Sequence, residues 1–362
     1  MEKSSKSSVT LKEIARMVGC TPSAVSVVLN GSHGNTKVSE ELRERIMKVA
    51  REVNYRPNSM SQSLRRRSCR TLGIFVCSGA WHGLGMGYEM TMFRGVEQVA
   101  RKYDYDLLLL NMNFELHPDH CFEKLASHRI DGLLLMHVSG DTKWITELQT
   151  HNPNIVHLDS AGECEDIDSI EFDCQHAVLT ALRHLRELGH RRVGFIGSGT
   201  KNGPLDKMTR RRMDAFVSAA GMEEFNGMEL LMYTSRIFEQ TDDYCQLEGV
   251  HGIRYFLGLP EPPTAVITYN SLVGICARQE AERLNVRVPQ DLSIIGIDRA
   301  MNINSFLPGL TAVDHPLEQI GSSGVELLIA KIENRDFSKV KRVFRGNVVD
   351  DTTTAPPPCS RK

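Results

Sequence analysis

Residues 10–31 read TLKEIARMVGCTPSAVSVVLNG, and this stretch decides the fold of the first part of the chain. Thr10 and Glu13 have the spacing of a capping box, which predicts that a helix begins here. Gly19 ends this helix, and Thr21 has the position of an N-cap for a second one. Two short helices joined by a tight glycine turn form a helix-turn-helix.

A third helix is expected after Ser39, which has the position of its N-cap. Its apolar residues recur at helical spacing and are Leu42, Ile46, Val49 and Val53. Three helices of this size close a small core, and a unit of about 50 residues is only marginally stable alone. We therefore expect a helix-turn-helix domain over 9–56.

Charge is divided unevenly between this head and the rest of the chain. Residues 1–70 hold 14 Lys and Arg against 6 Asp and Glu, whereas residues 71–362 hold 29 against 39. A basic head on an acidic body indicates that the head meets a polyanion such as double-stranded DNA. Charge added only for solubility gives the same totals, so charge alone leaves both interpretations open.

The second helix presents polar or small side chains that can reach bases and phosphates if it enters the major groove. Together with the helix caps, the candidate DNA contacts of the head are Thr10, Thr21, Pro22, Ser23, Ser26, Val27, Asn30 and Ser39. Val27 can contact a thymine methyl group but cannot hydrogen-bond guanine. The alternative is a helix that docks onto a protein.

Residues 57–67 follow the head as a short basic segment, PNSMSQSLRRR. Pro57 suits the first position of a helix, which is too short to be stable until something packs on it. Asn58 and Leu64 are further candidate DNA contacts, because Leu64 is an apolar side chain among cations, as a minor-groove wedge requires. The alternative is a flexible basic tether.

From residue 71 short apolar runs alternate with amphipathic helices such as 90–103 and 178–188. The runs are 72–76, 107–110, 132–136, 155–158, 193–196, 230–233, 265–268 and 293–297. Each unit is a strand followed by a helix, so the sheets should be parallel and buried on both faces. Eight strands exceed one compact sheet, which predicts an α/β body of two doubly wound lobes over 71–351.

The division between the lobes is expected in the acidic stretch 160–169. The first lobe would hold about 71–162 and 316–334, and the second about 163–298 and 340–351. Residues 352–362 are expected to form a flexible tail.

Ligands of open α/β sheets bind beyond the carboxyl ends of the strands. Polar residues at such positions are Ser78, His137, Asn270 and Asp298. Single hydrogen-bonding groups between two lobes suit a small polar ligand, although each residue taken singly is also compatible with a helix cap or a loop.

The motifs VTLKEIA at 9–15, GCTPSAVSVVLNG at 19–31 and YRPNSMSQSL at 55–64 resemble the lactose-repressor (LacI/GalR) family of bacterial transcription factors. The likeness runs from residue 9 to about 351 and implies a periplasmic-binding-protein-like body. It also implies that the second helix is a recognition helix, and that a hinge helix at 57–65 carries Leu64 as the wedge. Val27 stands where many members carry a guanine-reading Arg, which implies a different operator half-site.

In the body, PTAVITYN at 263–270 and VPQDLSIIGID at 288–298 resemble the effector-domain signatures of the family. The resemblance implies effector contacts at Arg212, Asn270, Asp298 and His315, the last at a position where Gln is common. Tyr88 stands where an effector-stacking Phe usually lies. Departures from the family pattern are Ser271, Arg299 and Asp350.

This resemblance implies an allosteric transcription regulator, most often a repressor. It would bind a near-palindromic DNA operator as a homodimer under the control of a small polar, sugar-like effector. No catalytic residue, cofactor or metal is expected. Two alternatives share a two-lobed body: a solute-binding protein, which needs a signal peptide and no basic head, and an enzyme acting on sugars or nucleotides, which needs a paired acid and base.

Targeting signals are not evident in the sequence. It holds no apolar stretch of about 18 residues and no secretory signal, so we expect a cytoplasmic protein at the bacterial nucleoid without membrane contact.

Nine scattered cysteines without a C-x-x-C pair predict free thiols. His117, His120 and Cys121 could ligate zinc, but a second cluster is lacking, so we interpret them as surface residues.

Overall fold

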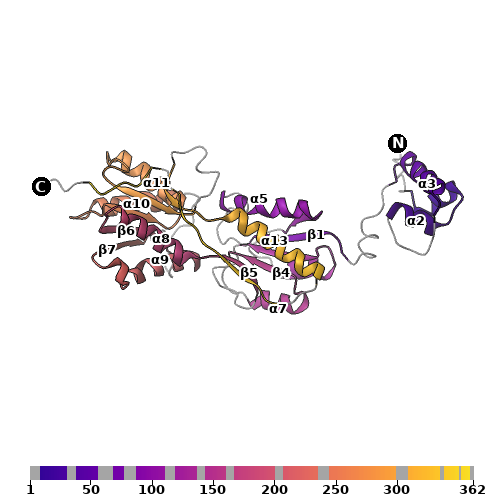
Figure 1. Ribbon diagram of the computed structural model, residues 1–362, viewed down its shortest axis with the longest axis horizontal. Helices are drawn as coiled ribbons and strands as arrows, with labels where there is room; N and C mark the ends of the chain where they lie inside the picture. The colour runs from indigo at the N-terminus through magenta and orange to yellow at the C-terminus, as the bar shows by residue number, and fades with distance from the viewer. Residues whose placement is uncertain are drawn as a thin grey trace, which may run out of the picture. The chain divides into compact units, whose positions relative to one another are not determined.

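The computed structural model describes residues 9–30, 38–55, 68–76, 87–110, 119–136, 143–159, 167–199, 207–234, 244–298, 309–334, 338–349 and 352–358. The chain divides into two compact units, residues 1–70 and residues 71–362. Figure 1 shows the head as a small group of helices and the body as two α/β lobes.

The head contains the three expected helices, α1 (Leu11–Val18), α2 (Pro22–Asn30) and α3 (Glu40–Glu52). The capping box forms, because the Thr10 backbone N–H donates to Glu13 Oε2 at 2.6 Å and the Glu13 N–H donates to Thr10 Oγ1 at 3.3 Å. Gly19 ends α1 with φ 73°, a left-handed conformation that glycine adopts without strain. Ile14, Val25 and Ile46 are fully buried and join the helices into one core.

The first lobe is built on a parallel sheet with the strand order β11-β5-β4-β3-β1-β2. Its strands are β1 (Thr71–Val76), β2 (Asp106–Leu109), β3 (Gly132–Met136), β4 (Ile155–Leu158), β5 (Asp168–Phe172) and β11 (Lys341–Phe344).

Helices cover both faces of this sheet. On one face α5 (Gly87–Lys102) lies beside α13 (Leu317–Asn334), and α6 (Asp119–Ala126) and α7 (Lys143–His151) pack on the other. Alternate residues of β3 face the two sides: Leu134 packs with the α5 face and Leu135 with the α6 face. The backbones of α5 and α13 lie in close contact, since a Cβ on Gly95 would lie 1.9 Å from the Glu318 carbonyl oxygen.

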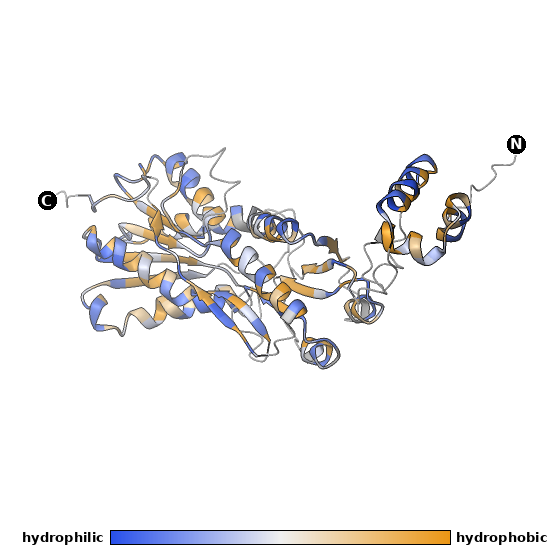
Figure 2. Ribbon diagram, turned by 45° about the vertical axis from the view of Figure 1, so that its right-hand side comes forward, coloured by the Kyte–Doolittle hydropathy of each residue, from blue (hydrophilic) through white to orange (hydrophobic). Residues whose placement is uncertain are grey.

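The second lobe has the strand order β12-β10-β9-β8-β6-β7, parallel except for β12. Its strands are β6 (Arg192–Gly197), β7 (Glu229–Thr234), β8 (Ala265–Thr268), β9 (Ser293–Ile297), β10 (Ala312–Val313) and β12 (Val348–Val349). The helices are α8 (Cys174–Glu187), α9 (Lys207–Ala219), α10 (Tyr244–Leu257) and α11 (Ser271–Arg283), with a short 3-10 turn at Glu223–Phe225. Figure 2 shows apolar residues concentrated in the strands of the body and polar residues along its helices.

The expected fold class is confirmed, and all eight apolar runs are strands. The expected division between the lobes is wrong. Strand β5 pairs with β4 and β11 pairs with β5, so 168–172 and 341–344 belong to the first lobe. The hydropathy pattern does not predict β5, because this strand contains acidic residues that are buried beside cations. Lys331 Nζ, for example, lies 2.7 Å from Asp168 Oδ2.

The expectation of a flexible tail is wrong for residues 352–358, which pack on the second lobe. Thr353 is fully buried; its N–H donates to Thr311 Oγ1 at 3.2 Å and its hydroxyl donates to the Ile294 carbonyl at 2.6 Å. The Ala355 carbonyl lies 2.9 Å from His190 Nε2. Hydroxyl and backbone groups hold this segment, and hydropathy does not register such bonds.

Candidate functional site

The candidate DNA contacts on the head lie at the start of α2 and at the helix caps. Thr21, Pro22 and Ser23 are exposed, and Ser26 and Val27 are half-buried. The Thr21 hydroxyl also accepts from the Ala24 N–H at 3.2 Å, so it caps α2. The exposed first turn of α2 carries no charged side chain.

The other candidate contacts of the head divide into two groups. Thr10 and Ser39 are exposed caps of α1 and α3. The Asn30 side chain, Asn58, Leu64 and the segment 57–67 lie outside the described residues.

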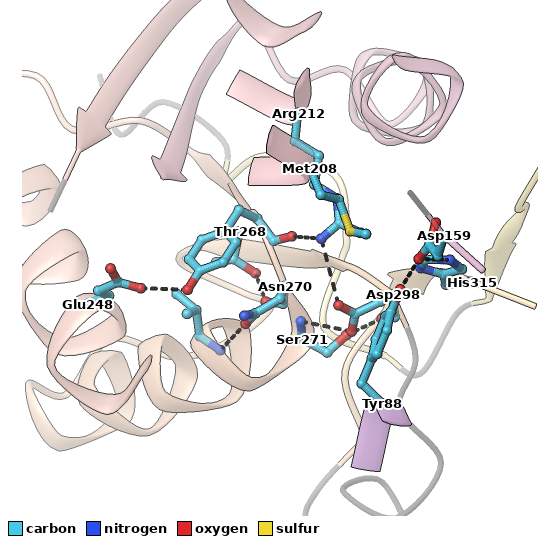
Figure 3. Close-up of polar contacts among 12 residues, drawn as sticks. Tyr88, Asp159, Met208, Arg212, Glu248, Thr268, Asn270, Ser271, Asp298 and His315 are labelled. Carbon is cyan, nitrogen blue, oxygen red and sulfur yellow. Dashed lines mark hydrogen bonds and ion pairs between the residues drawn. The ribbon is translucent and has the colours of Figure 1, made fainter. Parts of the chain in front are cut away.

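In the second lobe, Arg212 and Asp298 form a buried pair. Arg212 lies on α9 and Asp298 directly follows β9, with Arg212 Nη1 3.8 Å from Asp298 Oδ2. Arg212 Nη1 also donates to the Tyr269 carbonyl at 2.5 Å, and the Ser271 N–H donates to Asp298 Oδ1 at 3.3 Å. The guanidinium and the carboxylate are therefore held in place by backbone groups (Figure 3).

Burial dominates the electrostatics of this pair. It raises the pKa of Asp298 above the ordinary value of 3.8, and the charges of Arg212 and then His315 act in the opposite direction. Asp298 has φ 74°, a left-handed conformation that Asp tolerates better than most residues.

Asn270 follows β8 and caps α11, since its side-chain oxygen accepts from the Val273 N–H at 2.8 Å. Its backbone carbonyl accepts from the Thr268 hydroxyl at 2.8 Å. This residue therefore stands at the expected strand end with its amide oxygen engaged by the helix.

The polar group of the first lobe is centred on Asp159, which directly follows β4 and is buried. Asp159 Oδ2 accepts from the Tyr88 hydroxyl and lies 3.2 Å from His315 Nε2. Its Oδ1 accepts from the Phe172 N–H at 3.3 Å. The His315 ring stacks on Phe172 with 3.8 Å between centroids, so two aromatic residues and the imidazole surround the carboxylate.

Cys174 is the first residue of α8, where the chain crosses from the first lobe to the second. Burial raises the pKa of its thiol to about 11, against a lowering by Arg212 and together with a raising by Asp159. The thiol therefore stays protonated near neutral pH and lies under the influence of both polar groups.

The structure brings Arg212 and Asp298 into one group and Tyr88 and His315 into the other, while Asn270 lies next to the first. Ser78 and His137 lie outside the described residues. Four residues of the two groups are not predicted from the sequence: Asp159, Phe172, Cys174 and Tyr269. Asp159 could have been found, because it immediately follows the expected strand 155–158.

Two family models match this chain, one in the head and one in the body. The model of bacterial regulatory proteins of the lacI family matches residues 10–58, and that of the periplasmic binding protein-like domain matches residues 182–353. The first match lies in the head and the second in the body, so both parts of the chain are similar to those of lacI-family regulators. Among the described residues, no helix combines the length and apolarity that crossing a membrane would take.

Curated transcription repressors are similar to this chain over almost its whole length. It is 27% identical over 339 residues to the HTH-type transcriptional repressor PurR of Aliivibrio salmonicida, covering 92% of this chain and 95% of the relative. It is 28% identical over 327 residues to the ribose operon repressor of Haemophilus influenzae, covering 90% and 92%. The lac repressor dimer bound to operator and the anti-inducer ONPF has a similar fold, with a TM-score of 0.77 at 19% identity, covering 96% and 100%. The expected resemblance is confirmed: the chain is a DNA-binding transcription regulator with a lacI-type head and a periplasmic binding protein-like body.

Proposed function

We propose that this regulator is a cytoplasmic repressor that binds a near-palindromic operator as a homodimer and takes a small polar, sugar-like effector between the lobes of its body. One observation carries the effector site: the buried groups around Asp159 and Asp298 stand at strand ends of the two sheets. Ligands of such folds bind at this edge of the sheets.

The chemistry of the two groups favours a polyhydroxylated effector. Asp159 and Asp298 can accept hydroxyl hydrogen bonds, and Arg212 can donate to a sugar oxygen. Tyr88 and Phe172 offer apolar ring surface beside Asp159. We assign Ser78, His137 and Asn270 to the same site as further polar contacts. No catalytic step, cofactor or metal belongs to this proposal.

Control of DNA binding follows from the position of the effector between the lobes. A ligand that binds both lobes changes the angle between them, and operator binding responds if that angle decides whether the hinge segment 57–67 can fold on DNA. Coupling of this kind is reciprocal and typically amounts to about 1–3 kcal/mol.

On the DNA side, two heads of a homodimer would bind two half-sites, which multiplies a weak affinity through effective concentration. The exposed start of α2 would read the major groove, with Val27 against a thymine methyl group. Leu64 would enter the minor groove as a wedge.

Selection of bound genomic fragments tests the regulator role. The purified full-length protein is mixed with fragments of its source genome at about 150 mM salt, where non-specific binding is screened. A short near-palindrome should be recovered, and Leu64→Ala should weaken specific binding while sparing non-specific binding. Recovery of no preferred sequence, with or without added sugars, would contradict the proposal.

Binding of D-ribose and a panel of other neutral sugars, followed by calorimetry and by operator release, tests the effector site. A sugar that binds the wild type should lose its affinity in Arg212→Lys, which keeps the charge but not the forked geometry. Arg211→Lys is the matched control, because this neighbouring side chain is exposed. Equal loss in both variants, or binding by no sugar of the panel, would argue against the assignment.

A further inference from the structure

Glu248 is a buried carboxylate beside the effector site. It lies on α10 with 1% of its surface exposed. Its Oε2 accepts from the Tyr269 hydroxyl at 2.7 Å, and its Oε1 accepts from the Ser198 hydroxyl. Ser198 follows β6 and Tyr269 follows β8, and these two strands are neighbours. One carboxylate therefore ties together the carboxyl ends of two adjacent strands.

Tyr269 connects this carboxylate to the effector site. Its side chain donates to Glu248, and its carbonyl accepts from Arg212 Nη1 at 2.5 Å. Arg212 Nη1 in turn lies 3.8 Å from Asp298 Oδ2. Figure 3 shows this line of contacts running from Glu248 across the strand ends to Asp298.

The helix that carries Glu248 packs closely against its neighbours. A Cβ on Gly249 would lie 2.6 Å from the Val273 carbonyl oxygen of α11, and a Cβ on Gly252 would lie 2.6 Å from the Ile196 side chain of β6. Because backbone and side-chain atoms occupy that space, α10 holds the carboxylate at a fixed place relative to β6 and α11.

Glu280 provides a contrast within the same lobe. It lies on α11 and is 4% exposed, but it binds two arginines, Arg254 and Arg283, whose side chains are more than half exposed. Those arginines hold the pKa of Glu280 at about 2. This carboxylate links two helices at the surface, whereas Glu248 contacts hydroxyl groups at the edge of the site.

We propose that Glu248 is a positioning residue of the effector site: by holding the Tyr269 side chain, it sets the carbonyl that orients the Arg212 guanidinium. Its meaning for effector binding rests on the proposed function. The contacts from Glu248 through Tyr269 to Arg212 join residues of the protein itself, so they can be tested without an effector.

The test follows the guanidinium signal of Arg212 by NMR in the full-length protein labelled with ¹⁵N-arginine. Loss of one signal in Arg212→Lys assigns it. Glu248→Gln and Tyr269→Phe should each shift this signal, because the first weakens the acceptor of the Tyr269 hydroxyl and the second removes the hydroxyl. The double variant should shift it little further than Tyr269→Phe alone, since both changes act on the bond between Tyr269 and Glu248. Glu280→Gln should leave it in place.

An unchanged Arg212 signal in Glu248→Gln, or an equal shift in Glu280→Gln, would overturn the proposal. If Glu248→Gln does not fold, Tyr269→Phe decides the outcome, because it keeps the ring and the backbone carbonyl. Failure here is distinct from failure of the regulator role: the genomic selection depends on the head, whereas the NMR signal depends on the second lobe.

Discussion

The two halves of the proposed effector site share a backbone conformation but differ in their electrostatics. Asp159 follows β4 and Asp298 follows β9, and both have a left-handed backbone, with φ 55° and 74°. Both side chains are buried. The carboxylate of the second lobe faces Arg212, a permanent cation, whereas that of the first lobe receives the Tyr88 hydroxyl and faces the imidazole of His315.

This difference indicates which half of the site is held more firmly by the protein's own groups. A guanidinium held by the Tyr269 carbonyl keeps its charge at any physiological pH, so the Asp298 half is ordered before a ligand arrives. The Tyr88 phenol is a neutral donor that a ligand hydroxyl can replace at small cost. We therefore expect the second lobe to anchor the effector and the first lobe to adapt to it.

The largest expected effect comes from breaking the permanent pair. Arg212→Ala leaves the carboxylate of Asp298 buried without its cation, which should lower the free energy of unfolding by about 3–5 kcal/mol. Urea unfolding measures it. Arg345→Ala is the matched control, because its pair with Asp173 is exposed and should contribute about 0–1 kcal/mol. Similar losses in the two variants would show that burial does not matter here.

The first lobe should respond less to the same kind of change. Asp159→Asn keeps the shape but weakens the acceptor of the Tyr88 hydroxyl, so we expect a loss of about 1–3 kcal/mol by urea unfolding. A loss as large as that of Arg212→Ala would remove the contrast between the two halves.

Removing the donor alone should have a smaller effect. Tyr88→Phe deletes one hydroxyl and leaves Asp159 its contacts with Phe172 and His315, so the expected loss is about 0.5–1.5 kcal/mol. In the variant pair Asp159→Asn and Tyr88→Phe, the losses should be less than additive, which a double-mutant cycle measures. Full additivity would mean that the two residues act separately.

The smallest effect is a dependence of stability on pH. Burial raises the pKa of Asp298 in the folded protein above 3.8, so the folded state binds a proton more readily than the unfolded chain. This contribution is greatest below the ordinary pKa and is lost as pH rises through the raised value. The difference in unfolding free energy between wild type and Asp298→Asn should therefore move against the wild type from pH 4 to pH 8. A constant difference, or a change in the opposite direction, would contradict this assignment.

Some residues of the proposed site can be predicted from the sequence and others cannot. Asp298 and Asn270 follow apolar strands, so the rule for strand ends finds them, and the family resemblance adds Arg212, His315 and Tyr88. Phe172 and Cys174 escape because β5 is acidic and does not look like a buried strand. Glu248 escapes because it lies on a helix, far in sequence from Tyr269, and no local pattern relates them.

The sequence alone indicates eight of the strands, the helices and charge of the head and the family resemblance, because periodicity, helix caps and charge are local properties. Only the tertiary structure decides which sheet β5 and β11 join, how residues 352–358 are held, and which carboxylate faces which donor. The physical reason is that a polar side chain is tolerated inside a protein only when a partner satisfies it. That partner usually comes from a distant part of the chain, as Lys331 does for Asp168.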